Sequence, residues 1–225
     1  MIPEEGYQLI YSLEIPIEPD YKDSRPQYSV DRHQDVKTSF SRVAYYLELD
    51  DQYVWVSMDA FTIDRSKIGV PCYSLDCGDG VTRTVFQEVV ENVNIVSNVP
   101  GLDGAGLTGN IEFWPYDYSE NHIDIPGADG SKYDFGDRNG NSGWYGSMQV
   151  HVHSGGGYVG TVFAFNNFNR QEARPADLGI GNRSIEDPDW TFAANADTYN
   201  VRNLKVYTGS ASFQCCAVVE FLQEP

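Results

Sequence analysis

The sequence predicts an all-β protein folded as a two-sheet antiparallel β-sandwich, most simply a jelly roll. Short runs of alternating apolar and polar residues recur along the chain, with turn residues between them. About ten such runs occur, and that number at this spacing is typical of two packed sheets. Amphipathic runs of period 3.6 are missing, so we expect no helices.

We expect residues 1–225 to form one domain, with a core at about 7–208 and a C-terminal tail at 209–225. Strand-like runs continue along the chain, and no low-complexity linker interrupts them. Hydrophobic residues make up 41% of the chain, which is enough to bury a core.

The first half of the chain predicts a strand, a loop and a hairpin. Residues 7–15 form the first strand, and the polar residues 18–37 form a long loop. Residues 41–49 and 53–61 alternate in polarity and are joined by Asp50-Asp51, which predicts a β-hairpin. In its first strand Val43, Tyr45, Leu47 and Leu49 face the core.

The second half predicts further strands separated by glycine-rich or polar segments. Residues 101–109 read as a turn and 115–143 as a long loop, which inside a compact domain is usually functional or ordered by a metal. The expected strands are 85–99 (one long or two short), 109–114, 147–153 with its partner 158–168, 177–181, 190–194, 199–207 and 217–222.

Two of these strands carry a polar row opposite an apolar row. In residues 147–153, the side with Gln149, His151 and His153 is polar, and in 109–114 the corresponding side is Asn110, Glu112 and Trp114. If the two strands share a sheet, the rows form one surface with a carboxylate, amides, imidazoles and an indole. That composition suits a sugar-binding face, and it also suits a catalytic cleft.

Aromatic residues make up 13% of the chain, and tryptophan and tyrosine rings stack on the C–H faces of sugars. Amides, carboxylates and imidazoles would fix the positions of hydroxyl groups. Protonated histidines could also hold a sulfate or a uronate. The candidate ligand-binding residues are Trp55, Asp59, Glu112, Trp114, Gln149, His151, His153, Asn166 and Asn167.

A candidate Ca²⁺ site lies in the loop before residue 143. Oxygen ligands at alternating loop positions can converge on one calcium ion, and Asp137, Asn139 and Asn141 alternate in this way. Asp134, just before them, completes the candidate set. The alternative is a pair of Asn-Gly turns with solvated side chains. His151 and His153 have metal-ligand spacing but lack the glutamate expected after them, which favours a hydrogen-bonding role.

The formal net charge of −18 argues against nucleic acid and against anionic membranes as partners. The first residues lack the basic start and apolar run of a signal peptide. The protein is then either cytosolic or a trimmed module of a secreted or cell-surface protein, and we expect the latter. Cys72 and Cys77 either form a loop disulfide or stay reduced, as do Cys215 and Cys216.

Seven motifs along the chain share one further resemblance. They are FSRVAYYLEL from 40, YVWVSMDAF from 53, GNIEFWP from 109, YDFGD from 133, YGSMQVH from 145, DLGIGN from 177 and DWTF from 189. Together they resemble an accessory module of large secreted bacterial enzymes, the sialate O-acetylesterases and related polysaccharide-degrading proteins. The resemblance spans about residues 7–208 and implies a concanavalin-like, non-catalytic, carbohydrate-binding β-sandwich.

Two other functions stay open. Gln149-Val150-His151 resembles the Gln-Ile/Val-His signature of jelly-roll alginate lyases, which implies a polysaccharide lyase or hydrolase on this face, but the family's Tyr-Phe-Lys strand is absent. The third reading is a structural surface-assembly domain joined through the Cys215-Cys216 tail.

Overall fold

The computed structural model describes residues 4–15, 17, 28–32, 35, 40–60, 86–114, 144–145, 147–154, 157–166, 168–169, 177–182 and 194–210. These residues form β-strands and one short 3₁₀ turn, η3 (Ala196–Thr198). The strands are β1 (Tyr7–Glu14), β2 (Tyr28–Asp31), β3 (Arg42–Leu49), β4 (Gln52–Asp59), β5 (Phe86–Ser97), β6 (Gly104–Trp114), β7 (Trp144–Tyr145), β8 (Ser147–Ser154), β9 (Gly157–Asn166), β10 (Phe168–Asn169), β11 (Asp177–Asn182), β12 (Ala194–Asn195) and β13 (Arg202–Gly209).

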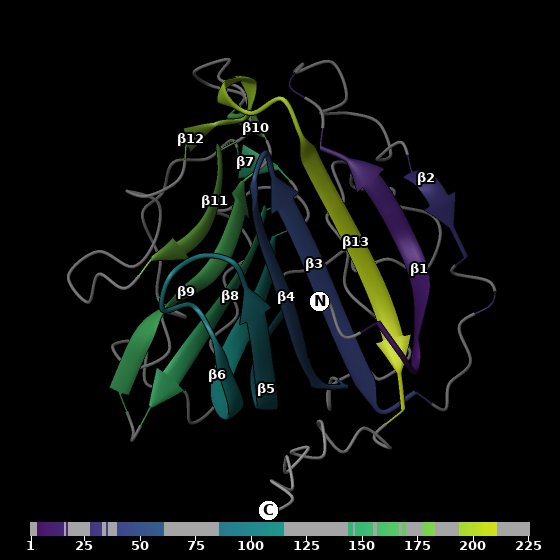
Figure 1. Ribbon diagram of the computed structural model, residues 1–225, viewed down its shortest axis with the longest axis vertical. Coiled ribbons are helices and arrows are strands. Elements are labelled where there is room, and N and C mark those ends of the chain that lie inside the picture. The colour runs from purple at the N-terminus through teal and green to yellow at the C-terminus, as the bar shows by residue number, and fades with distance from the viewer. Residues whose placement is uncertain are drawn as a thin grey trace, which may run out of the picture.

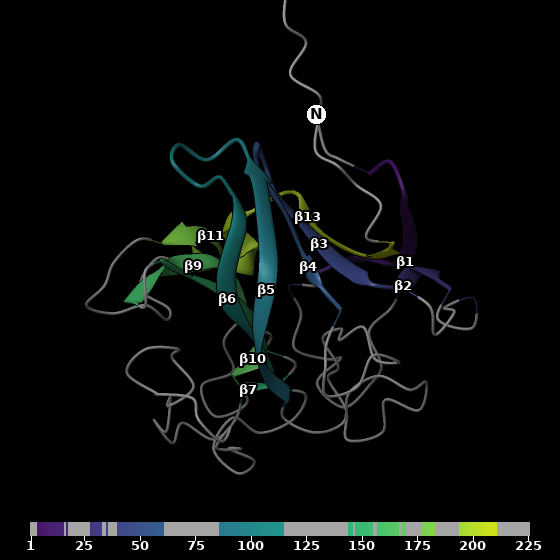
Figure 2. The same cartoon turned by 90° about the horizontal axis from the view of Figure 1, so that it is seen from below.

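Eleven strands form one continuous antiparallel sheet, in the order β12-β11-β9-β8-β6-β5-β4-β3-β13-β1-β2. Strands β7 and β10 pair separately. The large sheet is strongly bent (Figures 1 and 2): β5 and β6 lie between one arm with β9 and β11 and another with β3, β4, β13 and β1. Across the bend, β11 contacts β3 and β4, and β9 contacts β4.

The main hydrophobic core fills the inside of this bend, and we call the side of the sheet that carries it the inner face. The core forms on this face because every second side chain of a strand points to the same face, and the apolar residues of each strand alternate with polar ones. Tyr45 of β3 and Phe163 of β9 are fully buried and their rings lie 6.3 Å apart across the core. Val43, Leu47 and Leu49 point the same way, as the sequence predicts.

The β3–β4 hairpin is built around Asp50, which adopts a left-handed conformation with φ of 53°. Its Oδ1 accepts hydrogen bonds from the backbone N–H groups of Asn200 (2.7 Å) and Val201 (2.9 Å). Aspartate tolerates this conformation better than most side chains do. The turn therefore also anchors the segment that leads into β13.

Strand β13 is the last described strand of the chain, yet it lies inside the sheet, between β1 and β3. Its yellow ribbon runs beside the purple and blue strands of the N-terminal part (Figure 1). Arg202 fastens its start to the end of β1, because its Nε donates to the carbonyl of Ile15 (2.7 Å) and Nη2 to Glu14 (3.0 Å).

The all-β, antiparallel prediction is confirmed. The division into two sheets of a jelly roll is not confirmed, because hydrogen bonding is continuous from β12 to β2. Two local predictions were wrong. The expected loop at 18–37 contains β2, which pairs with β1, and the expected turn at 101–109 is largely the start of β6. The expected strand at 217–222 lies outside the described residues.

Candidate functional site

The polar rows that the sequence predicts lie side by side on the outer face, opposite the core. Strand β6 pairs directly with β8, and the register places Asn110 opposite His151 and Glu112 opposite Gln149. Strand β9 continues the row with Thr161 opposite His151. The condition attached to the prediction, that both strands share a sheet, is therefore met.

Asn110, Gln149, His151 and Thr161, which we call the buried row, have no exposed surface at all. His151 lies between two of the others: its Nε2 is 2.8 Å from Gln149 Oε1 and its Nδ1 is 3.1 Å from Thr161 Oγ1. Buried polar groups need such partners, because an unmade hydrogen bond there costs about 1–3 kcal/mol. The buried row thus connects β8 and β9 through side chains.

One polar atom of the buried row lacks a partner among the described residues. Gln149 Nε2 is buried and makes no hydrogen bond with them, although the same amide contacts His151 through Oε1. Gly109 lies next to this row in β6, and a Cβ there would collide with the backbone carbonyl oxygen of His151. Only glycine allows β6 and β8 to approach so closely at this point.

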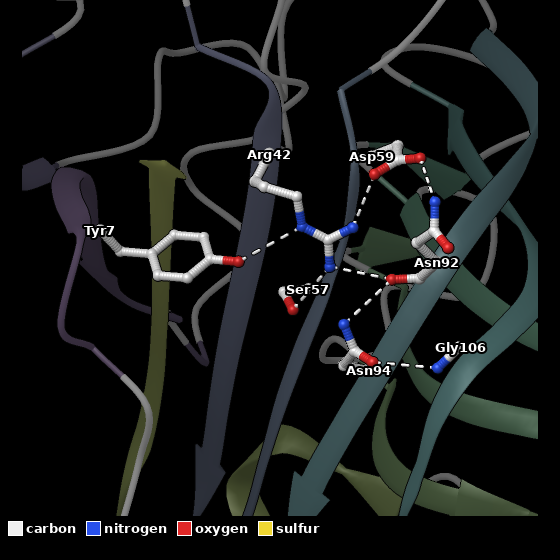
Figure 3. A network of polar contacts seen from close by, with 7 residues as sticks. All are labelled: Tyr7, Arg42, Ser57, Asp59, Asn92, Asn94 and Gly106. Atoms are coloured by element: carbon white, nitrogen blue, oxygen red, sulfur yellow. Dashed lines mark hydrogen bonds and ion pairs between the residues drawn. The ribbon is translucent and has the colours of Figure 1, made fainter. Parts of the chain in front are cut away.

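A second polar group on the outer face reaches solvent. Arg42, Ser57, Asp59 and Asn92, which we call the Arg42 network, come from β3, β4 and β5 (Figure 3). The hairpin register places Arg42 directly opposite Asp59. Arg42 Nη1 lies 2.7 Å from Asp59 Oδ1, and the two side chains are 9% and 45% exposed. A nearly buried guanidinium thus holds a half-exposed carboxylate.

The guanidinium has further partners. Its Nη2 donates to Ser57 Oγ (3.0 Å) and to the carbonyl of Asn92 (2.9 Å), and its Nε makes a long contact of 3.5 Å with the hydroxyl of Tyr7. Figure 3 shows Tyr7 on one side of Arg42 and Asp59 on the other. The planar fork of donors suits such simultaneous contacts and fixes the position of the group.

Asn92 joins the network because β5 has a bulge. The register with β6 shifts between Val90 and Val93, and Asn92 is left-handed with φ of 52°. Its side chain donates to Asp59 Oδ2 (2.6 Å), while its carbonyl accepts from Arg42 and from Asn94 Nδ2 (3.1 Å). β-bulges re-aim side chains in this way, often next to functional sites.

The carboxylate of Asp59 is half-exposed, so a ligand can reach it. Each carboxylate oxygen accepts one hydrogen bond inside the protein, from Arg42 or from Asn92. An ionised carboxylate has about four acceptor positions, so roughly half of them remain open to solvent. The arrangement can accept hydrogen bonds from hydroxyl groups at a fixed place, with Asn92 and Asn94 beside it.

An aromatic cluster lies next to the Arg42 network on the same face. Trp55 is 1% exposed, with its ring 5.1 Å from that of Tyr7 in an edge-on arrangement and 4.9 Å from that of Tyr207. Its Nε1 makes no hydrogen bond within the described residues, and the ring packs in a cluster with Ala44, Tyr46 and Tyr207. Trp55 therefore packs against the outer face and contacts Tyr7, a residue that is itself partly exposed.

Two tyrosines of this cluster are hard to ionise. Burial, and then the charge of Glu48, raise the pKa of Tyr46 to about 12. Burial and the hydrogen bond from its hydroxyl to Glu4 (2.9 Å) raise the pKa of Tyr207 further. Both hydroxyls stay neutral at any physiological pH.

The remaining candidate residues are described only in part. Glu112 and Trp114 lie in β6, His153 in β8 and Asn166 in β9, but their side chains are outside the described structure. Asn167 and the calcium candidates Asp134, Asp137, Asn139 and Asn141 lie outside it entirely, as do all four cysteines. Among the residues that are described, no three His, Cys, Asp or Glu side chains gather as a metal site would need.

Sequence reasoning missed Arg42, Asn92 and Asn94. For Arg42 a signal existed, because a hairpin turning at Asp50-Asp51 places it opposite Asp59. For Asn92 the signal was weaker. The apolar residues Val90 and Val93 are three apart, which breaks the period of two and marks a bulge.

Comparisons of the chain with protein-family models, with curated proteins and with solved structures found no match. The resemblance to accessory modules of secreted enzymes therefore stays a prediction. Within the described ranges, the structure has no helix long and apolar enough to cross a membrane.

Proposed function

We propose that the protein is a non-catalytic carbohydrate-binding module of a secreted polysaccharide-degrading system, and that the glycan binds at Asp59. One observation carries the proposal: a half-exposed carboxylate is held in place from two sides, by Arg42 and by Asn92. A pre-positioned acceptor loses little freedom when a sugar hydroxyl donates to it, and low ordering cost favours binding. Tyr7 offers a partly exposed ring nearby.

The contrast with the buried row supports binding over catalysis. A lyase or hydrolase using Gln149 and His151 requires substrate to touch them, and neither has exposed surface. The two side chains contact each other, and the second ring nitrogen of His151 contacts Thr161. The predicted contact of Gln149 and His151 with a ligand therefore requires a rearrangement that exposes these two side chains.

We further propose that the two arms of the bent sheet correspond to the two layers of the predicted jelly-roll sandwich. Contacts of β9 and β11 with β3 and β4 across one core support this layering. The calcium site predicted at Asp134, Asp137, Asn139 and Asn141 would order the long loop of that sandwich.

The test is affinity electrophoresis of the whole chain against a polysaccharide panel, with and without calcium, and with product analysis in the same samples. Retardation without new reducing ends or unsaturated products is the expected result. Asp59→Asn should weaken the retardation about 10-fold or more. Asp197→Asn is the matched control, because it removes the same charge from an exposed aspartate near the opposite end of the β3–β4 hairpin. New products would instead favour the lyase or hydrolase.

A further inference from the structure

The contacts of the Arg42 network also bear on the kind of glycan that fits. We infer that the Asp59 site takes an uncharged, hydroxyl-bearing segment of a polysaccharide and rejects uronate and sulfate groups. This inference rests on the proposed carbohydrate-binding function. It narrows the sequence prediction, which allowed sulfated and uronate-containing glycans through protonated histidines.

The one cation in the network is already occupied. Arg42 donates to Asp59 and Ser57 of β4 and to the backbone carbonyl of Asn92 in β5. Its side chain is only 9% exposed. Recognition of a carboxylate or sulfate by arginine needs exposed, preferably paired N–H donors. Because these donors are committed to internal acceptors, Arg42 is not available to an anionic sugar, and it is the one cation of the network among the described residues.

The atoms that remain open are mostly acceptors. Asp59 keeps acceptor positions on both carboxylate oxygens, and Asn92 Oδ1 accepts no hydrogen bond from any residue that the structure describes. A sugar hydroxyl can donate to such atoms, whereas ionised carboxylates and sulfates only accept. Asn94 uses one amide N–H on the carbonyl of Asn92, and its second N–H can serve a hydroxyl oxygen. This mixture matches the dual donor and acceptor character of hydroxyl groups.

The route to anionic glycans through His151 is closed in this structure. His151 is fully buried, and its two ring nitrogens contact Gln149 and Thr161. The formal net charge of −18 also repels polyanions at a distance, an effect that salt weakens. The local and the long-range electrostatics therefore select against the same class of ligand.

The experiment compares three polysaccharide classes in native gels, each at low and at 0.5 M NaCl. The probes are uncharged dextran, galactomannan, xylan and mixed-linkage β-glucan; the uronates alginate and polygalacturonate; and sulfated carrageenan. Chitosan adds a cationic arm, because an acidic protein can bind it non-specifically. The wild-type chain, Asp59→Asn and Asp197→Asn are run side by side, with circular dichroism and urea unfolding to confirm that each variant folds.

The expected result is retardation by at least one uncharged polysaccharide, unchanged in 0.5 M NaCl. Asp59→Asn should weaken it about 10-fold or more, since hydrogen bonds to a charged group contribute that much, and Asp197→Asn should leave it unchanged.

Three results would overturn the inference. Retardation by an anionic polysaccharide that changes in Asp59→Asn but not in Asp197→Asn would refute the ligand class while the binding function stands. Retardation by chitosan alone, lost in 0.5 M NaCl, would show only non-specific attraction. If no probe retards the wild-type chain, the proposed function itself fails, and with it the ligand class.

Discussion

The buried row and the Arg42 network lie on the same face of one sheet and are built from similar polar residues, yet they differ in exposure. Gln149 and His151 have no exposed surface, while Asp59 is 45% exposed and is fixed by a nearly buried arginine. Polar composition alone therefore does not mark a binding site. What distinguishes the second group is a partly exposed acceptor whose position the protein has already fixed.

The largest expected effect is on the buried row. Gly109→Ala introduces a Cβ against the backbone carbonyl of His151, so β6 and β8 must separate. We expect the free energy of unfolding to fall by about 2–4 kcal/mol, measured by urea denaturation. Gly106→Ala is the control: it has open space around it but a positive φ of 64°, so only about 1 kcal/mol should be lost. Equal losses in the two variants would contradict the close-approach argument.

His151→Ala separates stability from binding. It leaves Gln149 Oε1 and Thr161 Oγ1 without the contact shown here, so unfolding should become easier by about 2–3 kcal/mol. Glycan retardation should not change below the unfolding transition. Thermal unfolding and affinity gels on the same preparation check both statements. A folded His151→Ala protein that no longer binds would show that the buried row contacts the ligand, as the sequence predicts.

Arg42→Ala tests whether Arg42 holds Asp59 in place within the Arg42 network. It leaves Asp59, Ser57 and the carbonyl of Asn92 without their common donor, and we expect a loss of about 2 kcal/mol of stability. Arg42→Lys keeps the charge but not the planar fork, so it should lose about half as much. A double-mutant cycle with Asp59→Ala should give a favourable coupling energy. Zero coupling would mean that Arg42 does not position Asp59.

The smallest expected effect concerns the aromatic cluster at high pH. The pKa of Tyr46 is raised to about 12, and that of Tyr207 is raised further. Since tyrosines in the unfolded chain ionise near the ordinary pKa of 10, the stability contributed is complete below pH 10. It is lost as the pH rises from 10 towards 12. Denaturant unfolding at pH 9 and 11 measures the loss, which a Tyr46→Phe, Tyr207→Phe double variant should reduce. If the double variant loses as much stability between pH 9 and 11 as the wild-type chain, groups other than Tyr46 and Tyr207 cause the loss.

The strand alternation was enough to predict the all-β class, the β3–β4 hairpin and the polar rows of β6 and β8, but it left open whether these two strands pair. These follow from a period of two and from short turns, which are local properties of the sequence. The continuity of the sheet could not be predicted, because it depends on β13 entering between β1 and β3 from the far end of the chain.

The solvent exposure of the polar residues on the outer face also could not be predicted from the sequence. A polar residue on the outer side of a strand looks the same whether solvent or another part of the chain lies above it, and His151 and Asp59 illustrate the two cases. Trp55 was predicted to bind a ligand through its ring, but that ring is 1% exposed between Tyr7 and Tyr207. Its ligand contact stays a prediction, which would need these rings to move.

The most direct measurement compares Asp59→Asn and His151→Ala in one affinity gel series with the uncharged polysaccharide that retards the wild-type chain. Asp59→Asn should remain folded and bind about 10-fold or more weakly, and His151→Ala should bind normally despite its lower stability. The reverse pattern, with binding lost only in His151→Ala, would contradict the assignment of the site to the Arg42 network.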